Sequence, residues 1–425
     1  MASASFATPC ARPEEVGTYD SETRAALGLV ESLIGRFGPR LAGSGACLDA
    51  AAALREEAAG CSDRAECEDF AVHPGAFLGF IRLLVVLYLA SALLLPFAAP
   101  LSALLTSLGL AVLVLGFVLY HGVLDPFWPA KRGRNVTAVL EPRERAERVL
   151  IVSGHHDSAR VFNFYVDRPE LYAPRVYGGI GTYVGAWLLS VLLALFGAPS
   201  LVLGAGTAIL LAAFLFIRPL WNFASREGTP GAGDNLVASA VGLGVLRHFR
   251  SLREAGSGLA TTRLVFVSFD AEEAGLRGAR AWARAHRAEL LATPTVALNM
   301  DCLYARSDLR FLTSDINGSV ALSEPLAALC VRIAAEAGHA ARAEPIAFLT
   351  GGTDAAELAK AGVAATTLIG MAWSNETRSS AYHTPADTLE AVDPGVVDAA
   401  FGIALALAEA LDRGLMDRGP TRDRG

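Results

Sequence analysis

Two long apolar blocks constrain this chain more than any other feature of its sequence. The first runs from Leu83 to Ala99, is interrupted at PFAAP, and resumes from Leu101 to Tyr120. The second runs from Gly178 to Phe196, is interrupted at GAPS, and resumes from Leu201 to Ile217. Each limb is about as long as a helix must be to cross a bilayer core of ~30 Å. The sequence therefore predicts two transmembrane helical hairpins rather than two buried hairpins of a large soluble core.

The overall composition agrees with this prediction. Of the 425 residues, 53% are hydrophobic and 19% are charged, and the mean hydropathy of +0.40 is high for a soluble enzyme. The net charge of −7 argues against a nucleic-acid partner, because phosphate binding needs a concentrated basic face. The first 25 residues hold no apolar core of signal-peptide length. We therefore expect an internal segment to direct the chain to the membrane.

Outside the two blocks the pattern is α/β. Short, continuously apolar runs alternate with helical patterns such as SEPLAALCVRIAAEAG, as is typical of strands that helices cover on both faces. The predicted strands are Asn135–Leu140, Arg148–Ser153, Arg263–Phe269, Pro294–Met300 and Ala364–Gly370.

Acidic residues and histidines follow three of these predicted strands. They are His155 and Asp157 after the second strand, Asp270, Glu272 and Glu273 after the third, and Asp301 after the fourth. Two predicted loops add Asp234 in PGAGDN, and His383 and Asp387 in YHTPADT. In open α/β sheets, ligands bind beyond the carboxyl ends of the strands. We therefore expect these residues to converge in one crevice.

The residues at the strand ends indicate metal chemistry. Alternate residues of an extended segment share a face, so His155 and Asp157 are predicted to lie together and His156 opposite them. A carboxylate beside a metal-binding imidazole usually fixes the ring's orientation, which makes His155 the expected ligand and His156 a structural or rim residue. In the adjacent pair Glu272 and Glu273, one carboxylate can bind metal while the other accepts a proton from an activated water.

The complete set of candidate ligands consists of two histidines and three carboxylates. This nitrogen and oxygen set suits two hard or borderline divalent ions, of which Zn²⁺ fits best and Mn²⁺ or Co²⁺ are alternatives. Paired ions need a bridging carboxylate and can jointly activate one water.

Five motifs together resemble the M28 family of zinc-dependent exopeptidases. SGHHDS, PGAGDN, FDAEEAGLRGA, LNMD and YHTPADT occur in the family's order and local form, and GPRLAGSG and NVTAVL are similar to its leading segment. The resemblance implies an α/β fold in which a mixed, mostly parallel sheet is sandwiched by helices, the zinc exopeptidase fold. It also implies an aminopeptidase-like enzyme with two Zn²⁺ ions per chain.

The same resemblance assigns roles to individual residues. Five metal ligands are implied: His155 and Glu273 bind one ion each, Asp234 bridges, and Asp301 and His383 complete the two sites. Glu272 would be the general base. Asp157, which we group with the catalytic residues, and Asp387 would be supporting carboxylates.

The chain departs from the family pattern in three places. The first hairpin interrupts the stretch before NVTAVL, and the second lies between His155 and Asp234, where the family has a short connection. The segment GGTDAAEL keeps Asp354 but lacks the histidine that often follows there. We predict a discontinuous peptidase domain, two inserted transmembrane hairpins and a disordered tail. Their boundaries are residues 1–76, 124–176 and 222–415 for the domain, 77–123 and 177–221 for the hairpins, and 416–425 for the tail.

These features favour a membrane-anchored metallo-aminopeptidase that hydrolyses the N-terminal peptide bond of peptides through a water activated by two zinc ions. A glutaminyl cyclase or a carboxypeptidase on the same fold remains an alternative, as does a catalytically inactive binding or scaffold module. A transporter is disfavoured because the four apolar limbs contain no acid, base or histidine. Met371 and Trp373 are predicted to line the substrate pocket, and the sequence does not predict the oligomeric state.

The basic residues near the hairpins predict an orientation in the membrane. The two short turns carry no charge. The basic residues flank the spans on the side of the peptidase domain, and they are Arg82, Lys131, Arg132, Arg134, Arg175, Arg218 and Arg226. The positive-inside rule then places the peptidase domain on the cytoplasmic side of a bacterial inner membrane. Sequons at Asn135, Asn317 and Asn375 point to the opposite side, but Asn135 opens a predicted buried strand.

Overall fold

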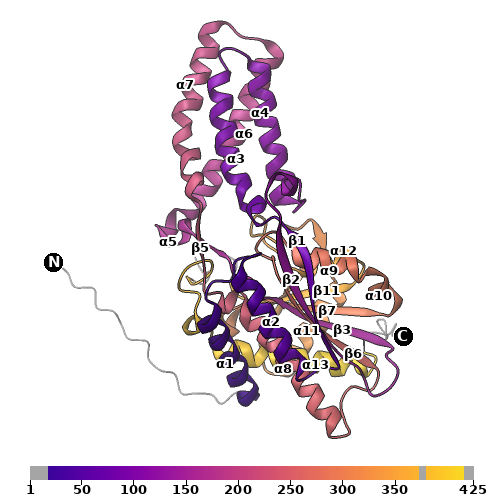
Figure 1. The fold of residues 1–425 in the computed structure, drawn as a ribbon. Helices are drawn as coiled ribbons and strands as arrows, with labels where there is room; N and C mark the ends of the chain where they lie inside the picture. Colours follow the sequence, from indigo (N-terminus) through magenta and orange to yellow (C-terminus); the bar gives the residue numbers. More distant parts are fainter. Residues whose placement is uncertain (1–17, 373–379, 416–425) are drawn as a thin grey trace, which may run out of the picture.

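The computed structural model describes residues 18–372 and 380–415 as two parts, an α/β domain and a bundle of four helices that extends from it (Figure 1). The bundle consists of α3 (Pro74–Leu94), α4 (Ala99–Val112), α6 (Tyr172–Phe196) and α7 (Ser200–Ile217). A π-helical segment, η1 (Leu113–Val118), extends α4. The predicted tail at 416–425 and Trp373 lie outside the described residues.

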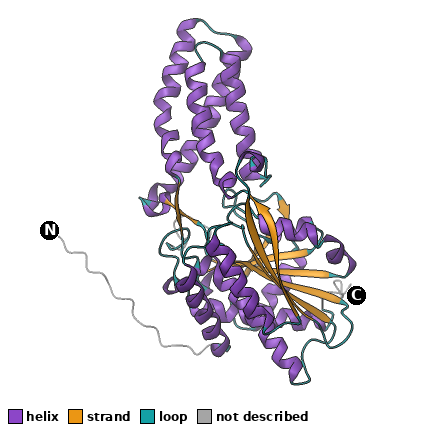
Figure 2. Ribbon diagram, in the orientation of Figure 1, coloured by secondary structure: helices purple, strands orange, loops and turns teal. Residues whose placement is uncertain are grey.

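A mixed sheet forms the centre of the α/β domain (Figure 2). Its strands are β1 (Arg64–Val72), β2 (Lys131–Leu140), β3 (Arg148–His155), β6 (Thr262–Phe269), β7 (Thr295–Leu303), β8 (Leu309–Asp315), β9 (Val320–Ala321), β10 (Arg342–Pro345) and β11 (Ala364–Gly370). The order is β1-β2-β6-β3-β7-β11-β8-β10, with β9 beside β8. The central run β6-β3-β7-β11 is parallel, and β1, β2 and β8 pair antiparallel to their inner neighbours. The predicted fold class is confirmed, and each predicted strand is present.

Helices cover both faces of the sheet. One face carries α1 (Asp20–Phe37), α2 (Gly45–Ala59), α8 (Val237–Glu254), α11 (Glu324–Glu336) and α13 (Pro394–Asp412). The other carries α9 (Arg277–Ala285), α10 (Arg287–Ala292) and α12 (Ala355–Lys360). In β3, Leu150 and Val152 belong to the first core, whereas Val149 and Ile151 belong to the second. This alternation explains why the strands read as continuous apolar runs.

Within residues 18–372 and 380–415, five helices are long and apolar enough, by length and composition, to cross a membrane. One of them, α13, packs in the core of the α/β domain, where Val397 and Phe401 are buried. The other four form the bundle, which exposes large apolar side chains such as Phe97 (86%), Leu201 (85%) and Leu215 (73%). A surface of this kind favours contact with hydrocarbon over contact with water.

Two bundle helices begin earlier than the predicted apolar limbs. Helix α3 begins at Pro74, well before Leu83, and α6 begins at Tyr172 rather than Gly178. Hydropathy marks only the apolar part of a helix, and the first turns of α3 and α6 include Arg82 and Arg175. Proline near the helix start is favourable because its missing N–H would have no intrahelical partner there.

Buried hydroxyl groups connect the helices inside the bundle. Ser102 Oγ lies 2.7 Å from Ser91 Oγ on α3 and 3.0 Å from Ser190 Oγ on α6. The Tyr88 hydroxyl donates a hydrogen bond of 3.0 Å to the carbonyl of Leu210 on α7. Hydrogen-bonded small polar residues are typical of helix contacts in membranes.

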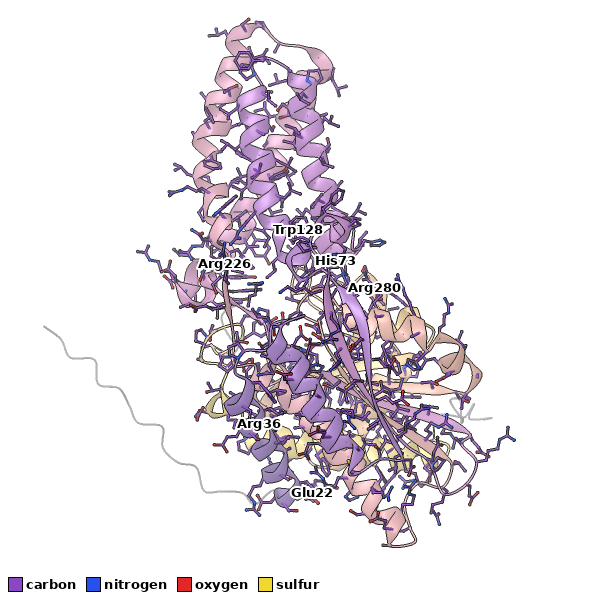
Figure 3. All side chains as sticks on the ribbon, in the orientation of Figure 1. Glu22, Arg36, His73, Trp128, Arg226 and Arg280 are labelled. Atoms are coloured by element: carbon purple, nitrogen blue, oxygen red, sulfur yellow. The ribbon has the colours of Figure 1, made fainter. Side chains whose placement is uncertain are left out.

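Several contacts join the bundle to the α/β domain at the end of the first hairpin. The carbonyl of Tyr120 accepts a 2.7 Å hydrogen bond from Arg280, and Arg277 forms a 2.9 Å ion pair with Asp125. Trp128 lies at the base of the bundle beside His73 (Figure 3). A Cβ at Gly79 would lie 2.7 Å from the Trp128 ring, so this indole needs a glycine beneath it. These contacts hold the base of the bundle against the domain.

Candidate metal centre and active site

The structure brings the five predicted metal ligands together at one edge of the sheet. His155 ends β3, Asp301 lies in β7, and Glu273 follows β6. Because β6, β3 and β7 are parallel neighbours, their carboxyl ends meet at the same edge. Asp234 and His383 reach it from the segment before α8 and from the loop before α13, and the peptide bond after Asp234 is cis.

Asp234 lies between two groups of donor atoms. Its Oδ1 is 3.3 Å from His155 Nε2, and its Oδ2 is 3.1 Å from His383 Nε2. Asp301 Oδ1 lies 3.8 Å from the same nitrogen of His155. Glu273 Oε1 lies 3.2 Å from His383 Nε2. Two three-residue groups that can each hold a cation therefore share the carboxylate of Asp234.

The donor atoms fit divalent cations. His155 Nε2 and Asp234 Oδ2 are buried and have no hydrogen-bond partner among the described residues. Burial and the carboxylates around it hold the pKa of Glu272 well above its ordinary value. Burial opposes protonation of His155, but Asp157, Asp234 and Asp301 outweigh it and raise the pKa of that imidazole. Buried carboxylates without a compensating cation are costly, and paired divalent ions would supply that charge.

Asp157 ties the end of β3 to the loop that carries both glutamates. Its two carboxylate oxygens accept hydrogen bonds from the backbone N–H groups of Glu272 (3.1 Å) and Glu273 (3.2 Å). One of these oxygens also lies 3.3 Å from His155 Nδ1. Asp157 therefore fixes the ring of one candidate ligand and the position of the candidate base together.

Asp387 supports the loop that carries Asp234. Its Oδ1 accepts a hydrogen bond of 2.9 Å from the N–H of Gly233. The ring of Tyr304 packs so closely that a Cβ at Gly233 would lie 2.4 Å from it, so a larger residue would displace the loop. Burial, together with the neighbouring Asp234, raises the pKa of Asp387 to about 7.

Sequence reasoning missed three residues around the centre. The buried guanidinium of Arg40 donates hydrogen bonds to the carbonyls of His156, Pro230 and Gly231, and so holds the segment before Asp234. Asp315 ends β8 and accepts hydrogen bonds from the N–H and hydroxyl of Thr353 at 2.8 and 2.6 Å. Asp315 also lies at a strand end, but LRFLTSD is not a continuously apolar run, so this strand was not among those predicted.

The third residue is Asp354, which the sequence marked only as a retained motif residue. Both of its carboxylate oxygens are buried and have no hydrogen-bond partner among the described residues. Burial and the neighbouring Asp301 raise its pKa well above the ordinary value, although His155 opposes the shift.

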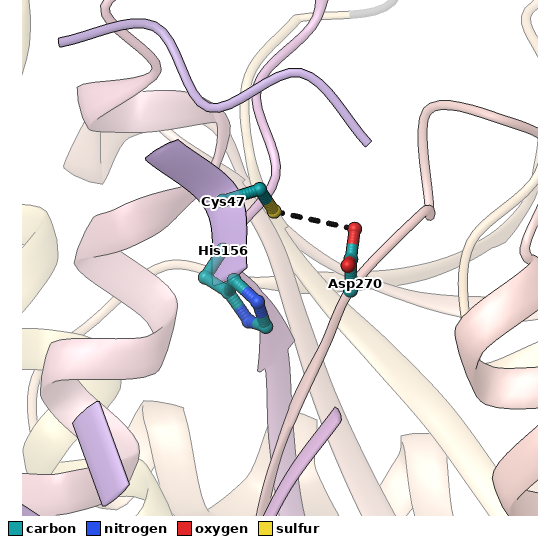
Figure 4. Close-up of side chains that lie close together, drawn as sticks. All are labelled: Cys47, His156 and Asp270. Carbon is teal, nitrogen blue, oxygen red and sulfur yellow. Dashed lines mark hydrogen bonds between the residues drawn. The ribbon is translucent and has the colours of Figure 1, made fainter. Parts of the chain in front are cut away.

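Asp270, which we expected in the crevice, instead belongs to a separate buried group with Cys47 and His156 (Figure 4). The Cys47 thiol donates to Asp270 Oδ1 at 3.2 Å, and Asp270 Oδ2 accepts from the Arg134 N–H at 2.8 Å. His156 Nδ1 lies 2.9 Å from the Ser268 hydroxyl. Asp270 lies in this group because it continues the alternation of β6. Ala271, with a φ of +61°, then turns the chain toward the centre.

A cavity of about 170 Å³ opens onto the candidate centre. Asp234, Glu272, Glu273, Asp301 and His383 form its polar end, and the rest of its lining is mainly apolar and aromatic. The predicted pocket residue Met371 lies in this lining.

Comparison with known proteins identifies the family of one part of the chain. Residues 221–408 match the model of peptidase family M28. This part of the chain is an M28 peptidase domain. The family assignment made from the motifs is thereby confirmed, and with it the expectation of an enzyme of the peptidase class. No curated protein is significantly similar in sequence.

Solved structures share the fold of the M28 domain. A Zn-dependent exopeptidase from Parabacteroides distasonis matches with a TM-score of 0.54 and 14% identity, over 91% of this chain and 97% of that one. A zinc aminopeptidase from Bacillus subtilis matches with a TM-score of 0.55 and 13% identity, over 91% of this chain and 95% of that one. A glutaminyl cyclase from Porphyromonas gingivalis matches with a TM-score of 0.53 and 13% identity, over 94% of this chain and 100% of that one. At these identities the likeness concerns the fold, which aminopeptidases and cyclases have in common.

Proposed function

We propose that this chain is a membrane-anchored metallo-aminopeptidase whose M28 domain removes N-terminal residues from peptides with the help of two divalent ions. Zn²⁺ is the ion that fits best. The observation that carries the proposal is Asp234, whose two oxygens face His155 and His383 at 3.3 and 3.1 Å. One carboxylate shared by two donor groups is the arrangement that paired ions require.

The distances support a role for each residue of the centre. His155 and Asp301 would hold one ion and Glu273 and His383 the other, with Asp234 bridging them. When bound, the ions supply Lewis-acid polarisation of the scissile carbonyl and lower the pKa of water. Glu272, whose Oε2 lies 3.8 Å from His155 Nε2, takes the proton of the attacking water and passes it to the leaving amine. Asp157 positions Glu272 through the backbone hydrogen bond at 3.1 Å.

Four helices would anchor this enzyme in the bilayer: α3, α4, α6 and α7. Their exposed apolar side chains and their hydroxyl contacts support this proposal, whereas the burial of α13 in the domain core argues against a fifth span. Both hairpins leave the M28 domain and return to it. The domain would therefore lie on one side of the membrane and the two short turns on the other.

The metal content tests the catalytic part of the proposal. We expect elemental analysis of the detergent-solubilised protein to give about two divalent ions per chain. Asp301→Asn should lose roughly one of them, because Asp301 belongs to only one of the two donor groups. Asp308→Asn is the matched control, since Asp308 lies close in sequence but in a separate 3-10 turn, and it should keep both ions. A single ion that Asp301→Asn does not affect would contradict a paired centre and favour the cyclase.

Reporter fusions test the orientation. We expect alkaline phosphatase fused after Gly425 to be inactive in a bacterial host, and a reporter active in the cytoplasm to be bright. The reason is the positive-inside rule, because the arginines and lysines near the spans lie on the side of the M28 domain. Bright alkaline phosphatase with a dark cytoplasmic reporter would place the peptidase outside the cytoplasm.

A further inference from the structure

A second cavity, of about 640 Å³, lies at the base of the helix bundle. Helix α3 lines one side of it, and the other side is formed by β4 (Arg160–Phe162), η4 (Arg218–Asn222) and β5 (Ala224–Gly228), which flank the second hairpin. Two of its lining residues, Trp128 and Arg226, mark the level at which the bundle meets the M28 domain (Figure 3). Sites for small molecules have volumes of ~300 to 1,000 Å³, so this cavity is large enough for a ligand.

Three arginines line this second cavity, which we call the basic cavity: Arg82, Arg160 and Arg226. None of the lining residues that the structure describes is acidic. Arg82 donates a hydrogen bond of 3.2 Å to the carbonyl of Trp221, and Arg160 donates to the carbonyls of Ser225 and Arg226 at 3.4 and 3.3 Å. Partial burial lowers the pKa of Arg160, and the charges of Arg82 and Arg226 lower it further. The three positive charges therefore repel one another, and an anion between them would be attracted.

The rest of the basic cavity is apolar and aromatic. Leu83 and Val86 of α3 line it together with the indole rings of Trp128 and Trp221. Val86 is 50% exposed and Trp221 45% exposed. Arg82 directly precedes the apolar limb that begins at Leu83. Basic and indole side chains at the start of a span are typical of the level of lipid headgroups, and the apolar side chains beyond them are at the level of acyl chains.

We propose that the basic cavity binds an anionic phospholipid of the surrounding membrane, whose phosphate the three arginines hold and whose acyl chain lies against Leu83 and Val86. Arginine binds phosphate oxygens through two parallel N–H groups, and basic pockets between membrane helices bind headgroups of this kind. A soluble phosphate compound would leave the apolar side chains exposed to water, which favours the lipid. The inference rests on the proposed anchoring of the bundle in a bilayer and does not depend on peptidase activity.

Strand β4 connects the basic cavity to the candidate metal centre. Arg160 begins this strand and Phe162 ends it. The N–H of Phe162 donates a hydrogen bond of 2.9 Å to the carbonyl of His383, and the two rings lie 4.3 Å apart between centroids. Leu78 and Phe223 line both this cavity and the one at the centre. A bound phosphate would offset the repulsion among the arginines, so we expect hydrogen exchange of the β4 amides to slow when the lipid binds.

Lipid binding to the full chain, delipidated in a neutral detergent, tests the inference. Native mass spectrometry compares dioleoylphosphatidylglycerol with dioleoylphosphatidylcholine, which carry the same acyl chains. We expect the wild type to bind a single phosphatidylglycerol roughly tenfold more tightly than phosphatidylcholine. Arg82→Gln, Arg160→Gln and Arg226→Gln should each weaken phosphatidylglycerol binding about fivefold, the effect of one basic residue near an anionic lipid. Arg218→Gln is the matched control, because Arg218 begins η4 at the same end of the bundle but lies outside the lining, and it should keep the wild-type affinity.

The outcomes separate this inference from the proposed anchoring. Equal affinity of the wild type for the two lipids overturns the site, and so does a wild-type preference in the variant that combines the three substitutions. If an equal concentration of glycerol 3-phosphate displaces phosphatidylglycerol, the ligand is a soluble phosphate compound and the lipid proposal is wrong. If the lipid binds and exchange in β4 does not slow, the connection through β4 is wrong.

Extraction of native membranes with alkaline carbonate tests the anchoring by itself. A chain that leaves the membrane contradicts the proposed anchoring, whereas a chain that stays and shows no lipid preference loses only the lipid site. The comparison of the two lipids on the wild type decides the question even where an arginine variant does not fold.

Discussion

Replacing Glu272 by glutamine is expected to lower turnover by ~10² to 10⁴-fold, the usual contribution of a general base. The Oε2 of this carboxylate lies 3.8 Å from His155 Nε2. Glu272 forms a further donor group with His155 and Glu273, but it lies outside the two groups that share Asp234. Glutamine keeps the shape and removes the proton acceptor. We therefore expect stopped assays of the detergent-solubilised variant to show the loss in kcat, with the divalent metal content unchanged.

Two further variants make this result specific. Glu273→Gln should lose both turnover and metal, because Glu273 Oε1 lies with His383 Nε2 and Asp234 in one donor group. Glu336→Gln, at the exposed end of α11, should change neither. If metal-replete Glu272→Gln retains activity within a factor of about three of the wild type, the base must be another group.

The sequence predicts which of these side chains meet at one edge of the sheet, because burial and strand direction are both visible in it. An apolar run that ends in an acid or a histidine marks a strand whose carboxyl end carries a functional side chain. His155, Glu273 and Asp301 were found in this way, and the parallel pairing of β6, β3 and β7 brings them together. The alternation of the pleat also predicted that His156 points away from His155.

The misplacement of Asp270 shows the limit of that reasoning. Its position after a buried run is the same as that of the other acids, but Phe269 ends β6 and the turn with positive φ comes only at Ala271. The strand's alternation therefore directs Asp270 toward Cys47. A turn of this kind depends on the tertiary hydrogen bonds from Glu272 and Glu273 to Asp157, which no local pattern records.

The part of the cavity at the candidate centre that the bundle helices line could not be predicted from the sequence, for a different reason. Hydropathy identified both hairpins, and the motif order showed that the second lies between His155 and Asp234. Hydropathy does not indicate which side of a uniformly apolar helix faces a cavity, because lipid and an apolar cavity accept the same side chains. Only the structure shows that the face of α6 with Val176 and Ile180 lines the cavity.

Blocking the N-terminus of a substrate is expected to abolish cleavage altogether, the second large effect of this account. An aminopeptidase acts on a free α-amine, which orients the first peptide bond of the substrate at the centre. Acetylation removes that amine, whereas amidation of the C-terminus changes a group remote from the scissile bond. One peptide of fixed sequence is the appropriate substrate for this comparison.

The central claim is tested most directly by mass spectrometry of one such peptide after incubation with the zinc-replete, detergent-solubilised protein. It is compared in three forms: free at both ends, N-acetylated, and C-amidated. The account predicts release of the first residue from the free and the C-amidated peptide and an intact N-acetylated peptide. Loss of the last residue from the free and the N-acetylated peptide, with the C-amidated form intact, would contradict it and make the enzyme a carboxypeptidase.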